Sequence, residues 1–164
     1  MKRIFTLSII FILTLVCLTG CIIIPLYKNY EIPADTVSSI EIYNTSQCEI
    51  DYGEFFKTEP AVYQIPEEQT ADFLSDLSQI RFSDAIVIIL AAMDPSFRYG
   101  EWVTRINYTD GTYEMISCAG YGETYDQNDN HIKSHHYGCD DDEWNHFIGK
   151  YLPTDVFEER EPEG

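Results

Sequence analysis

The stretch Glu101–Cys118, EWVTRINYTDGTYEMISC, predicts the central feature of the fold. An Asp110-Gly111 pair separates two runs in which apolar and polar side chains alternate, and this arrangement is the strongest local signal for a β-hairpin. A two-residue turn there predicts five cross-strand pairs: Tyr108 with Tyr113, Ile106 with Met115, Trp102 with Ala119, Arg105 with Ile116, and Val103 with Cys118.

These pairs divide the hairpin into two faces of different character. The face that carries Ile106 and Met115 is the more apolar, so we expect it to pack on the core. The more solvent-exposed face should then carry Arg105, Asn107 and Glu114.

A second turn is predicted at Asp126–Asn130, where Asp and Asn residues follow another strand-like run. If this turn is centred on Asn128-Asp129, the returning strand places Tyr121 opposite His136 and Tyr125 opposite Ile132. The opening of this segment also resembles a calcium loop. However, His131 and Tyr137 occupy the positions where that loop needs glycine and glutamate, so we interpret the segment as a hairpin turn.

The same register sets Cys118 opposite Cys139, and we predict a disulfide between them. Opposed residues on antiparallel strands have Cα atoms ~4.5–5.5 Å apart, within the range that a disulfide accepts. Two alternatives remain. In the first, a bulge at Gly120 or Gly122 shifts the register, and the two cysteines are buried as unpaired small residues. In the second, Cys48 forms the disulfide with one of them.

The rest of the chain predicts further elements of both kinds. Helices are predicted from Pro66, which suits a first turn, and from Asp140, which suits an N-cap. Strands are predicted at Val37–Tyr43 and Ala61–Ile65. The continuously apolar segment Ala85–Met93 is predicted to be a buried strand or a buried helix turn. The apolar stripes of the two helices are Phe73, Leu74, Leu77 and Ile80, and Trp144, Phe147, Ile148 and Tyr151. We therefore expect an α+β fold: a single domain with a mainly antiparallel β-sheet and two helices packed on it.

The beginning of the chain has the features of an export signal. Lys2 and Arg3 precede an uncharged apolar run from Ile4 to Leu18. The residues that follow, Leu18-Thr19-Gly20-Cys21, resemble the lipobox of bacterial lipoprotein precursors. That resemblance implies cleavage before Cys21, diacylglycerol on its sulfur and an acyl group such as palmitate on its amine. The alternative is an uncleaved anchor over residues 4–26, whose 23 uncharged residues could span a bilayer of ~30 Å. Both interpretations place the remaining chain on the extracytoplasmic side of the cell membrane.

These signals divide the chain into four parts. We expect a signal peptide at residues 1–20, a lipid-anchored tether at 21–35, the α+β domain at 36–153 and an acidic disordered tail at 154–164. Without residues 1–20 the chain keeps eight basic residues against 28 acids, a formal charge of −20. No cluster of Lys and Arg appears along the sequence, so we expect neither nucleic acid nor an anionic lipid surface as a partner.

All four histidines lie within the run HIKSHHYGCDDDEWNHF, residues 131–147. On a strand, His135 and His136 point to opposite faces, and His131 lies ~13 Å from His135. Zinc needs ligand nitrogens within ~2.1 Å of one ion, so we assign no metal ligand and no cofactor. His146 falls outside the apolar stripe of its helix. The alternative is an extracytoplasmic metal or small-ligand binder that uses the hairpin His131–Cys139.

No motif that carries a catalytic mechanism is present, so we predict that the chain is not an enzyme and assign no catalytic residue. A thiol nucleophile at Cys118 or Cys139 with His136 as base ranks third among the alternatives. Phe97, Arg98 and Tyr99 are residue types that dominate binding hot spots, and we predict that they form an interaction patch. The leading hypothesis is a membrane-anchored extracytoplasmic lipoprotein that acts as a binding module for a protein or envelope partner.

Overall fold

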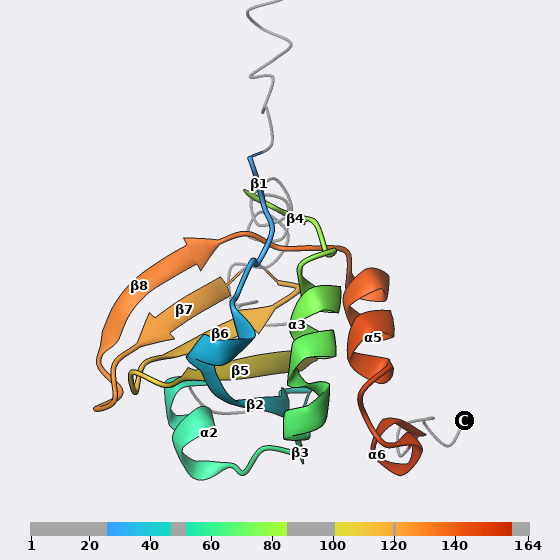
Figure 1. The fold of residues 1–164 in the computed structure, drawn as a ribbon, viewed down its shortest axis with the longest axis horizontal. Coiled ribbons are helices and arrows are strands. Elements are labelled where there is room, and N and C mark those ends of the chain that lie inside the picture. Colours follow the sequence, from blue (N-terminus) through green and yellow to red (C-terminus); the bar gives the residue numbers. More distant parts are fainter. Residues whose placement is uncertain (1–25, 47–51, 85–100, 120, 159–164) are drawn as a thin grey trace, which may run out of the picture.

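A six-stranded antiparallel sheet is the central layer of the computed structural model, which describes residues 26–46, 52–84, 101–119 and 121–158. The strands lie in the order β3-β2-β5-β6-β7-β8 (Figure 1). Their bounds are β2 (Val37–Asn44), β3 (Tyr63–Gln64), β5 (Trp102–Tyr108), β6 (Tyr113–Ser117), β7 (Tyr121–Tyr125) and β8 (His131–His136). The chain is therefore an α+β protein, as the sequence predicts. The predicted features at Cys21, Cys48, Ala85–Met93 and Phe97–Tyr99 fall outside the described residues.

The first hairpin has a three-residue loop, so the predicted two-residue turn is wrong. Tyr108 donates its N–H to the carbonyl of Thr112 at 2.8 Å, and the Gly111 N–H donates to Tyr108 at 3.1 Å. Gly111 has a φ of 88°, a left-handed conformation that glycine adopts at low cost. The Asp110 carboxylate holds the loop by accepting bonds from the N–H and the hydroxyl of Thr112, at 2.9 and 2.7 Å. Type I turns of this kind carry glycine in the left-handed position.

The extra loop residue shifts the strand pairing by one position. Ile106 pairs with Glu114 and Arg105 pairs with Met115, in place of the predicted Ile106–Met115 and Arg105–Ile116 pairs. A shift of one residue turns every side chain of the second strand to the other face. The prediction for the two faces is therefore wrong for β6: Met115 lies in a smaller cluster on the opposite face, and Glu114 lies on the side of the main core.

The second hairpin follows the predicted register over most of its length. Tyr121 pairs with His136 as predicted, but a register shift after Thr124 sets Tyr125 opposite His131 and not opposite Ile132. The Asp126 carboxylate accepts bonds from the backbone N–H groups of Asn128 and Asn130, which closes the predicted polar turn.

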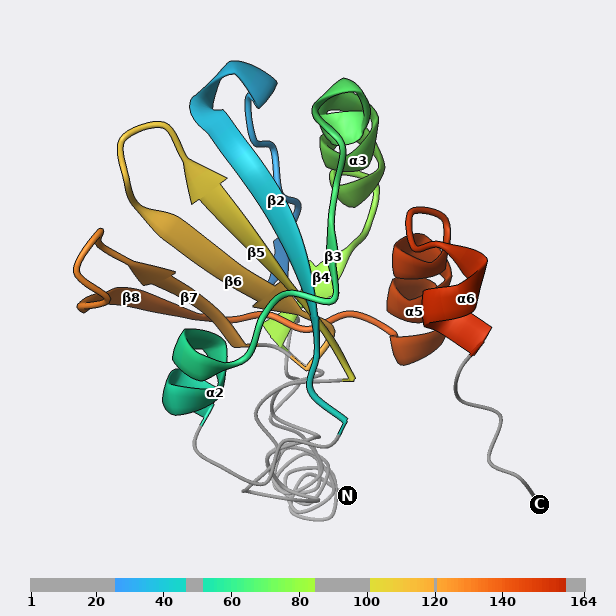
Figure 2. The ribbon, with the colours of Figure 1, turned by 90° about the horizontal axis from the view of Figure 1, so that it is seen from below.

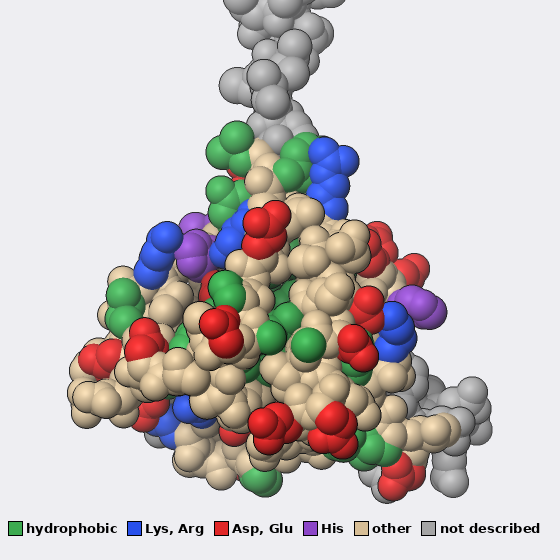
Figure 3. Space-filling view, in the orientation of Figure 1, with side chains coloured by type: hydrophobic (Ala, Val, Ile, Leu, Met, Phe, Trp, Pro, Cys, Tyr) green, Lys and Arg blue, Asp and Glu red, His purple; other side chains and the backbone are tan. Residues whose placement is uncertain are grey.

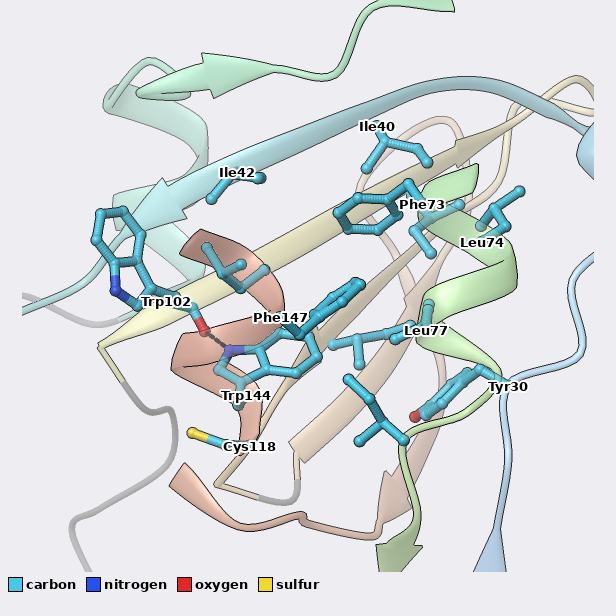
Figure 4. Close-up of a cluster of buried hydrophobic side chains, with 14 of the residues drawn as sticks. Tyr30, Ile40, Ile42, Phe73, Leu74, Leu77, Trp102, Cys118, Trp144 and Phe147 are labelled. Atoms are coloured by element: carbon cyan, nitrogen blue, oxygen red, sulfur yellow. Dashed lines mark hydrogen bonds between the residues drawn. The ribbon is translucent and has the colours of Figure 1, made fainter. Parts of the chain in front are cut away.

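Two helices cover one face of the sheet and form the main core with it (Figures 1 and 4). They are α3 (Thr70–Leu77), which continues the 3-10 turn η2 (Glu67–Gln69), and α5 (Asp141–Gly149). Asp140 caps α5 as predicted, because its carboxylate accepts from the N–H groups of Asp142 and Glu143. Trp144 is fully buried and donates its ring N–H to the carbonyl of Trp102 at 2.9 Å. Phe73 packs against Phe147 with ring centroids 4.8 Å apart, which joins the two helices.

The opposite face of the sheet is covered by α2 (Tyr52–Thr58) (Figure 2). Phe55 and Phe56 of this helix pack on a smaller cluster of buried residues: Tyr43, Val103, Tyr113 and Met115. Tyr113 and Met115 were predicted in the main core, and the register shift explains their position here.

The domain is longer at both ends than the sequence predicts. Residues 26–36, which we call the N-terminal strap, contain β1 (Tyr27–Lys28) and the 3-10 turn η1 (Ala34–Thr36), and β1 pairs with β4 (Phe82–Ser83). Tyr30 of the strap is buried in the main core, so the predicted tether 21–35 is part of the folded body from Leu26 onward. The predicted disordered tail begins with α6 (Thr154–Glu158), where Val156 packs against the main core. Among the described residues, no helix combines the length and the apolar character needed to cross a membrane.

Candidate functional site

A buried carboxylate, Glu114, meets a lysine of the N-terminal strap and a histidine of β8. The distances from Glu114 Oε1 are 3.6 Å to Lys28 Nζ and 3.7 Å to His135 Nε2. The Tyr108 hydroxyl donates to the other oxygen, Oε2, at 3.0 Å. We call these four residues, together with Tyr30, the Glu114 centre.

The Glu114 side chain is only 10 % exposed, and within the described parts of the chain its Oε1 atom has no hydrogen-bond partner. Burial lowers the pKa of Lys28, although Glu114 acts against this effect. Burial, with smaller contributions from Lys28, Lys133 and His136, lowers the pKa of His135 from 6.5 to about 4. At neutral pH the histidine is therefore neutral, and Lys28 is the cation that compensates the buried carboxylate.

Tyr30 holds the strap on the sheet beside this carboxylate. Its ring lies under Lys28, whose Nζ is 3.8 Å from the ring centroid, and burial raises the pKa of its hydroxyl. The hydroxyl approaches the backbone of Gly122 so closely that a Cβ at position 122 would lie 2.8 Å from it. Glycine is thus required at Gly122 for the strap to lie where it does.

The geometry of the Glu114 centre suits a contact that holds the N-terminal strap on the sheet better than it suits a metal site. A divalent cation at Glu114 and His135 would lie beside the Lys28 ammonium group, which repels it. Two other histidines lie outside this centre. His131 contacts the hydroxyl of Ser134 at 2.7 Å and packs on Tyr125, which lies beside the smaller cluster on the opposite face of the sheet. His146 is exposed on α5. In the portions of the chain that are described, no group of three His, Cys, Asp or Glu side chains could hold a metal ion.

The two cysteines of the predicted disulfide lie side by side in the main core. The Cys139 N–H donates to the Cys118 carbonyl at 2.9 Å, and both thiols are free in this structure. Burial raises the pKa of both thiols, and acids at the start of α5 raise it further, Asp141 at Cys118 and Glu143 at Cys139. The thiolate fraction at neutral pH is therefore very small, which disfavours the alternative of a thiol nucleophile.

Two open grooves run along the two sides of α3. One groove, of about 500 Å³, lies between α3 and the N-terminal strap and has apolar walls that include Ile32, Ala71 and Leu74. The other, of about 510 Å³, lies between α3 and the end of α5 and has polar walls that include Asp72 and Lys150. Ser75 lines both grooves, so they flank a single ridge.

Acidic side chains line these grooves and lie on the elements beside them. Glu31, Asp72 and Asp76 line the grooves, whereas Asp35 lies on η1 and Glu67 and Glu68 lie on η2, two turns that contact α3. We call these six residues the acidic face, and all of them except Asp76 are exposed. Figure 3 shows carboxylates spread over this side of the molecule. Asp76 is paired with Lys150 and accepts a bond from the Tyr151 hydroxyl at 2.6 Å, contacts that lower the pKa of its carboxyl. The other five carboxylates give the ridge a negative potential.

Tertiary structure brings together residues that sequence reasoning treated separately. His135 and Glu114 meet, whereas the sequence predicts Glu114 on the opposite, more solvent-exposed face of the sheet and connects Lys28 with neither residue. One signal for the acidic face was present in the sequence, since Glu67, Glu68 and Asp72 cluster at the start of the predicted helix. No family model matches this chain, and comparisons with curated proteins and with solved structures likewise found no match.

Proposed function

We propose that the protein is a lipid-anchored extracytoplasmic binding module whose acidic face takes a cationic segment of a protein or envelope partner. The anchor part of the proposal is supported by the sequence Leu18-Thr19-Gly20-Cys21 after a basic and apolar leader. The binding part is supported above all by one observation, the pair of grooves on either side of α3 with carboxylates along their rims.

The chemistry of the two grooves favours a ligand that is both cationic and partly apolar. The groove beside the strap offers the apolar side chains of Ile32 and Ala71 next to the carboxylate of Glu31. A Lys or Arg side chain buries its aliphatic stem on such a surface while its charged head reaches the acid. The groove beside α5 offers Asp72 on the other side of the ridge. A segment with basic residues could therefore contact both sides of α3.

Net charge alone would attract a cation to any part of this protein, so the test compares two placements of the same charge change. A fluorescent octalysine peptide is titrated with the full-length protein in maltoside micelles. We expect Glu31→Lys combined with Asp72→Lys to weaken binding ~10-fold, and increasing salt to weaken it further. The control, Glu59→Lys combined with Asp142→Lys, changes net charge equally at exposed acids outside the grooves.

A difference of less than ~2-fold between the two double variants would show that the peptide responds only to net charge, and the acidic face would be abandoned as the binding site. The partner itself is sought by crosslinking in membranes. The predicted patch Phe97, Arg98 and Tyr99 is included through Tyr99→Ala, which should lose the partner if that patch takes part in binding.

Anchoring is tested separately by metabolic labelling with a palmitate analogue. Label should appear on the wild-type protein and disappear in Cys21→Ala, because the resemblance assigns the acyl groups to the sulfur and amine of that residue. Equal labelling of both proteins would defeat the lipid anchor and favour the uncleaved apolar segment as the anchor.

A further inference from the structure

We propose that the end of the domain where the strap begins sits directly on the headgroups of the membrane, with Arg81 and Lys133 against lipid phosphates. We call this surface the tether end and define it by Leu26, Tyr27, Lys28, Arg81 and Lys133. The inference rests on the membrane anchoring proposed above, but it holds for an acylated Cys21 and for an uncleaved apolar anchor alike.

The chain is fixed to the folded body from Leu26 onward. The Leu26 N–H donates to the Asp84 carboxylate at 2.9 Å, and the Asp84 N–H donates to the Leu26 carbonyl at 3.2 Å. Beyond these contacts, β1 pairs with β4, and Lys28 meets Glu114. The strap is therefore part of the body and not a tether.

Only a short stretch of chain then connects Leu26 to the proposed anchor. Five residue steps separate Cys21 from Leu26, and a fully extended chain spans at most ~3.6 Å per residue, or ~18 Å in total. So short a connection keeps Leu26 within ~18 Å of Cys21. In the proposed arrangement the tether end is therefore the part of the domain that faces the headgroups in either anchoring mode.

The side chains at the tether end suit the membrane interface. Leu26 is 60 % exposed and Tyr27 is 50 % exposed, and the Arg81 guanidinium stacks on the Tyr27 ring at 3.5 Å from its centroid. Tyrosine is enriched at the level of the headgroups, and arginine pairs with phosphate oxygens in a bidentate manner.

Basic residues are unevenly distributed over the described parts of the chain. Lys133 is exposed on β8, two residues before His135, whose ring lies 3.7 Å from the Glu114 oxygen that Lys28 approaches at 3.6 Å. Three of the six basic residues in the described parts of the chain thus lie at the tether end, and Figure 3 shows Lys and Arg side chains near the end where the described chain begins. Two acids of the described chain lie beside these residues: the Asp84 carboxylate is bonded to Leu26, and Glu114 is paired with Lys28. The fold therefore gathers basic residues that are scattered along the sequence. For this reason the proposal departs from the expectation, based on the absence of a Lys and Arg cluster, that an anionic lipid surface is not a partner.

The experiment uses the full-length protein extracted from membranes and reconstituted in three environments: maltoside micelles, phosphatidylcholine nanodiscs, and nanodiscs with added phosphatidylglycerol. Lysine acylation and hydroxyl-radical oxidation are quantified by mass spectrometry. We expect labelling of Lys133 and oxidation of Tyr27 to fall at least ~3-fold from micelles to nanodiscs, and further with the anionic lipid. Lys57, exposed on α2, should be labelled equally in all three.

Two matched charge reversals complete the test. Lys133→Glu should restore oxidation of Tyr27 in the anionic nanodiscs, and Lys57→Glu should not. If the protein co-elutes with the nanodiscs but Tyr27 is oxidised equally in micelles and nanodiscs, the proposed contact of the tether end with the headgroups is overturned, and the membrane anchoring still holds. Protein that elutes apart from the nanodiscs would instead refute the membrane anchoring itself and the proposed contact with it.

Discussion

The backbone N–H of Cys139 bonds to the carbonyl of Cys118 at 2.9 Å, which places two buried thiols on neighbouring segments of one core. The pair follows the register of the second hairpin, in which Tyr121 lies opposite His136. Because the thiols share the core cluster and lie on adjacent segments, side-chain rotation alone is expected to bring the two sulfurs together.

We predict that these two thiols form a disulfide in the exported protein. Each sulfur loses its proton, and an extracytoplasmic disulfide or quinone oxidant accepts the two electrons. The intact mass before reduction should be lower by two hydrogen atoms, and one linked peptide should contain Cys118 and Cys139. Closing a loop of this size should add ~3 kcal/mol to the free energy of unfolding. A linked peptide that contains Cys48 would contradict this pairing.

Trp144 should be the most sensitive single position of the main core. It is fully buried, and its ring N–H bonds to Trp102 (Figure 4). Urea unfolding should show a loss of ~3–5 kcal/mol for Trp144→Ala and ~1–3 kcal/mol for Trp144→Phe, which keeps an aromatic ring but removes the donor. Tyr151→Phe, which removes a half-exposed hydrogen bond to Asp76, should cost less than ~1 kcal/mol. If Trp144→Phe costs as little as Tyr151→Phe, the buried bond contributes little.

Gly122→Ala should loosen the N-terminal strap, because the added Cβ would lie 2.8 Å from the Tyr30 hydroxyl. We expect a loss of ~1–3 kcal/mol in the free energy of unfolding and faster hydrogen exchange in β1. In a Tyr30→Phe background the clash is absent, so the same substitution should cost less than half as much. Additive effects of the two changes would show that they do not share this contact.

Acidification should destabilise the protein through His135. Its pKa is about 4 in the folded protein, mainly because of burial, against an ordinary value of 6.5. The unfolded chain binds more protons between these values, so the free energy of unfolding should fall as the pH drops from about 6.5 to about 4, by ~2–3 kcal/mol at most. Lys28, Lys133 and His136 act in the same direction at this ring, and Glu114 lies against it.

The measurement is urea unfolding across that pH range for two matched variants. His135→Gln should flatten the slope because a titrating group with a lowered pKa is removed. His146→Gln changes an exposed histidine on α5 and should leave the slope as it is in the wild type. An unchanged slope in His135→Gln would assign the acid sensitivity to other groups.

The first hairpin shows why its register could not be read from the Asp-Gly signal. Asp110-Gly111 does form the turn, but the Asp110 carboxylate bonds to Thr112 and a third residue joins the loop. Two-residue and three-residue loops share this signal and differ by one residue in register. The choice decides which face Glu114 occupies, and hence whether a buried carboxylate exists at all.

Local patterns in the sequence determined the α+β class, the stripes of α3 and α5, the cap at Asp140 and most of the register of the second hairpin. These features depend on neighbours along the chain, within the reach of helix period, strand period and turn chemistry. Only the tertiary structure decided that Lys28 meets Glu114, that the strap belongs to the domain, and that Arg81 lies over the ring of Tyr27. Those contacts join segments that are far apart in the sequence, and the local periodicity of a segment does not encode which distant segment packs against it.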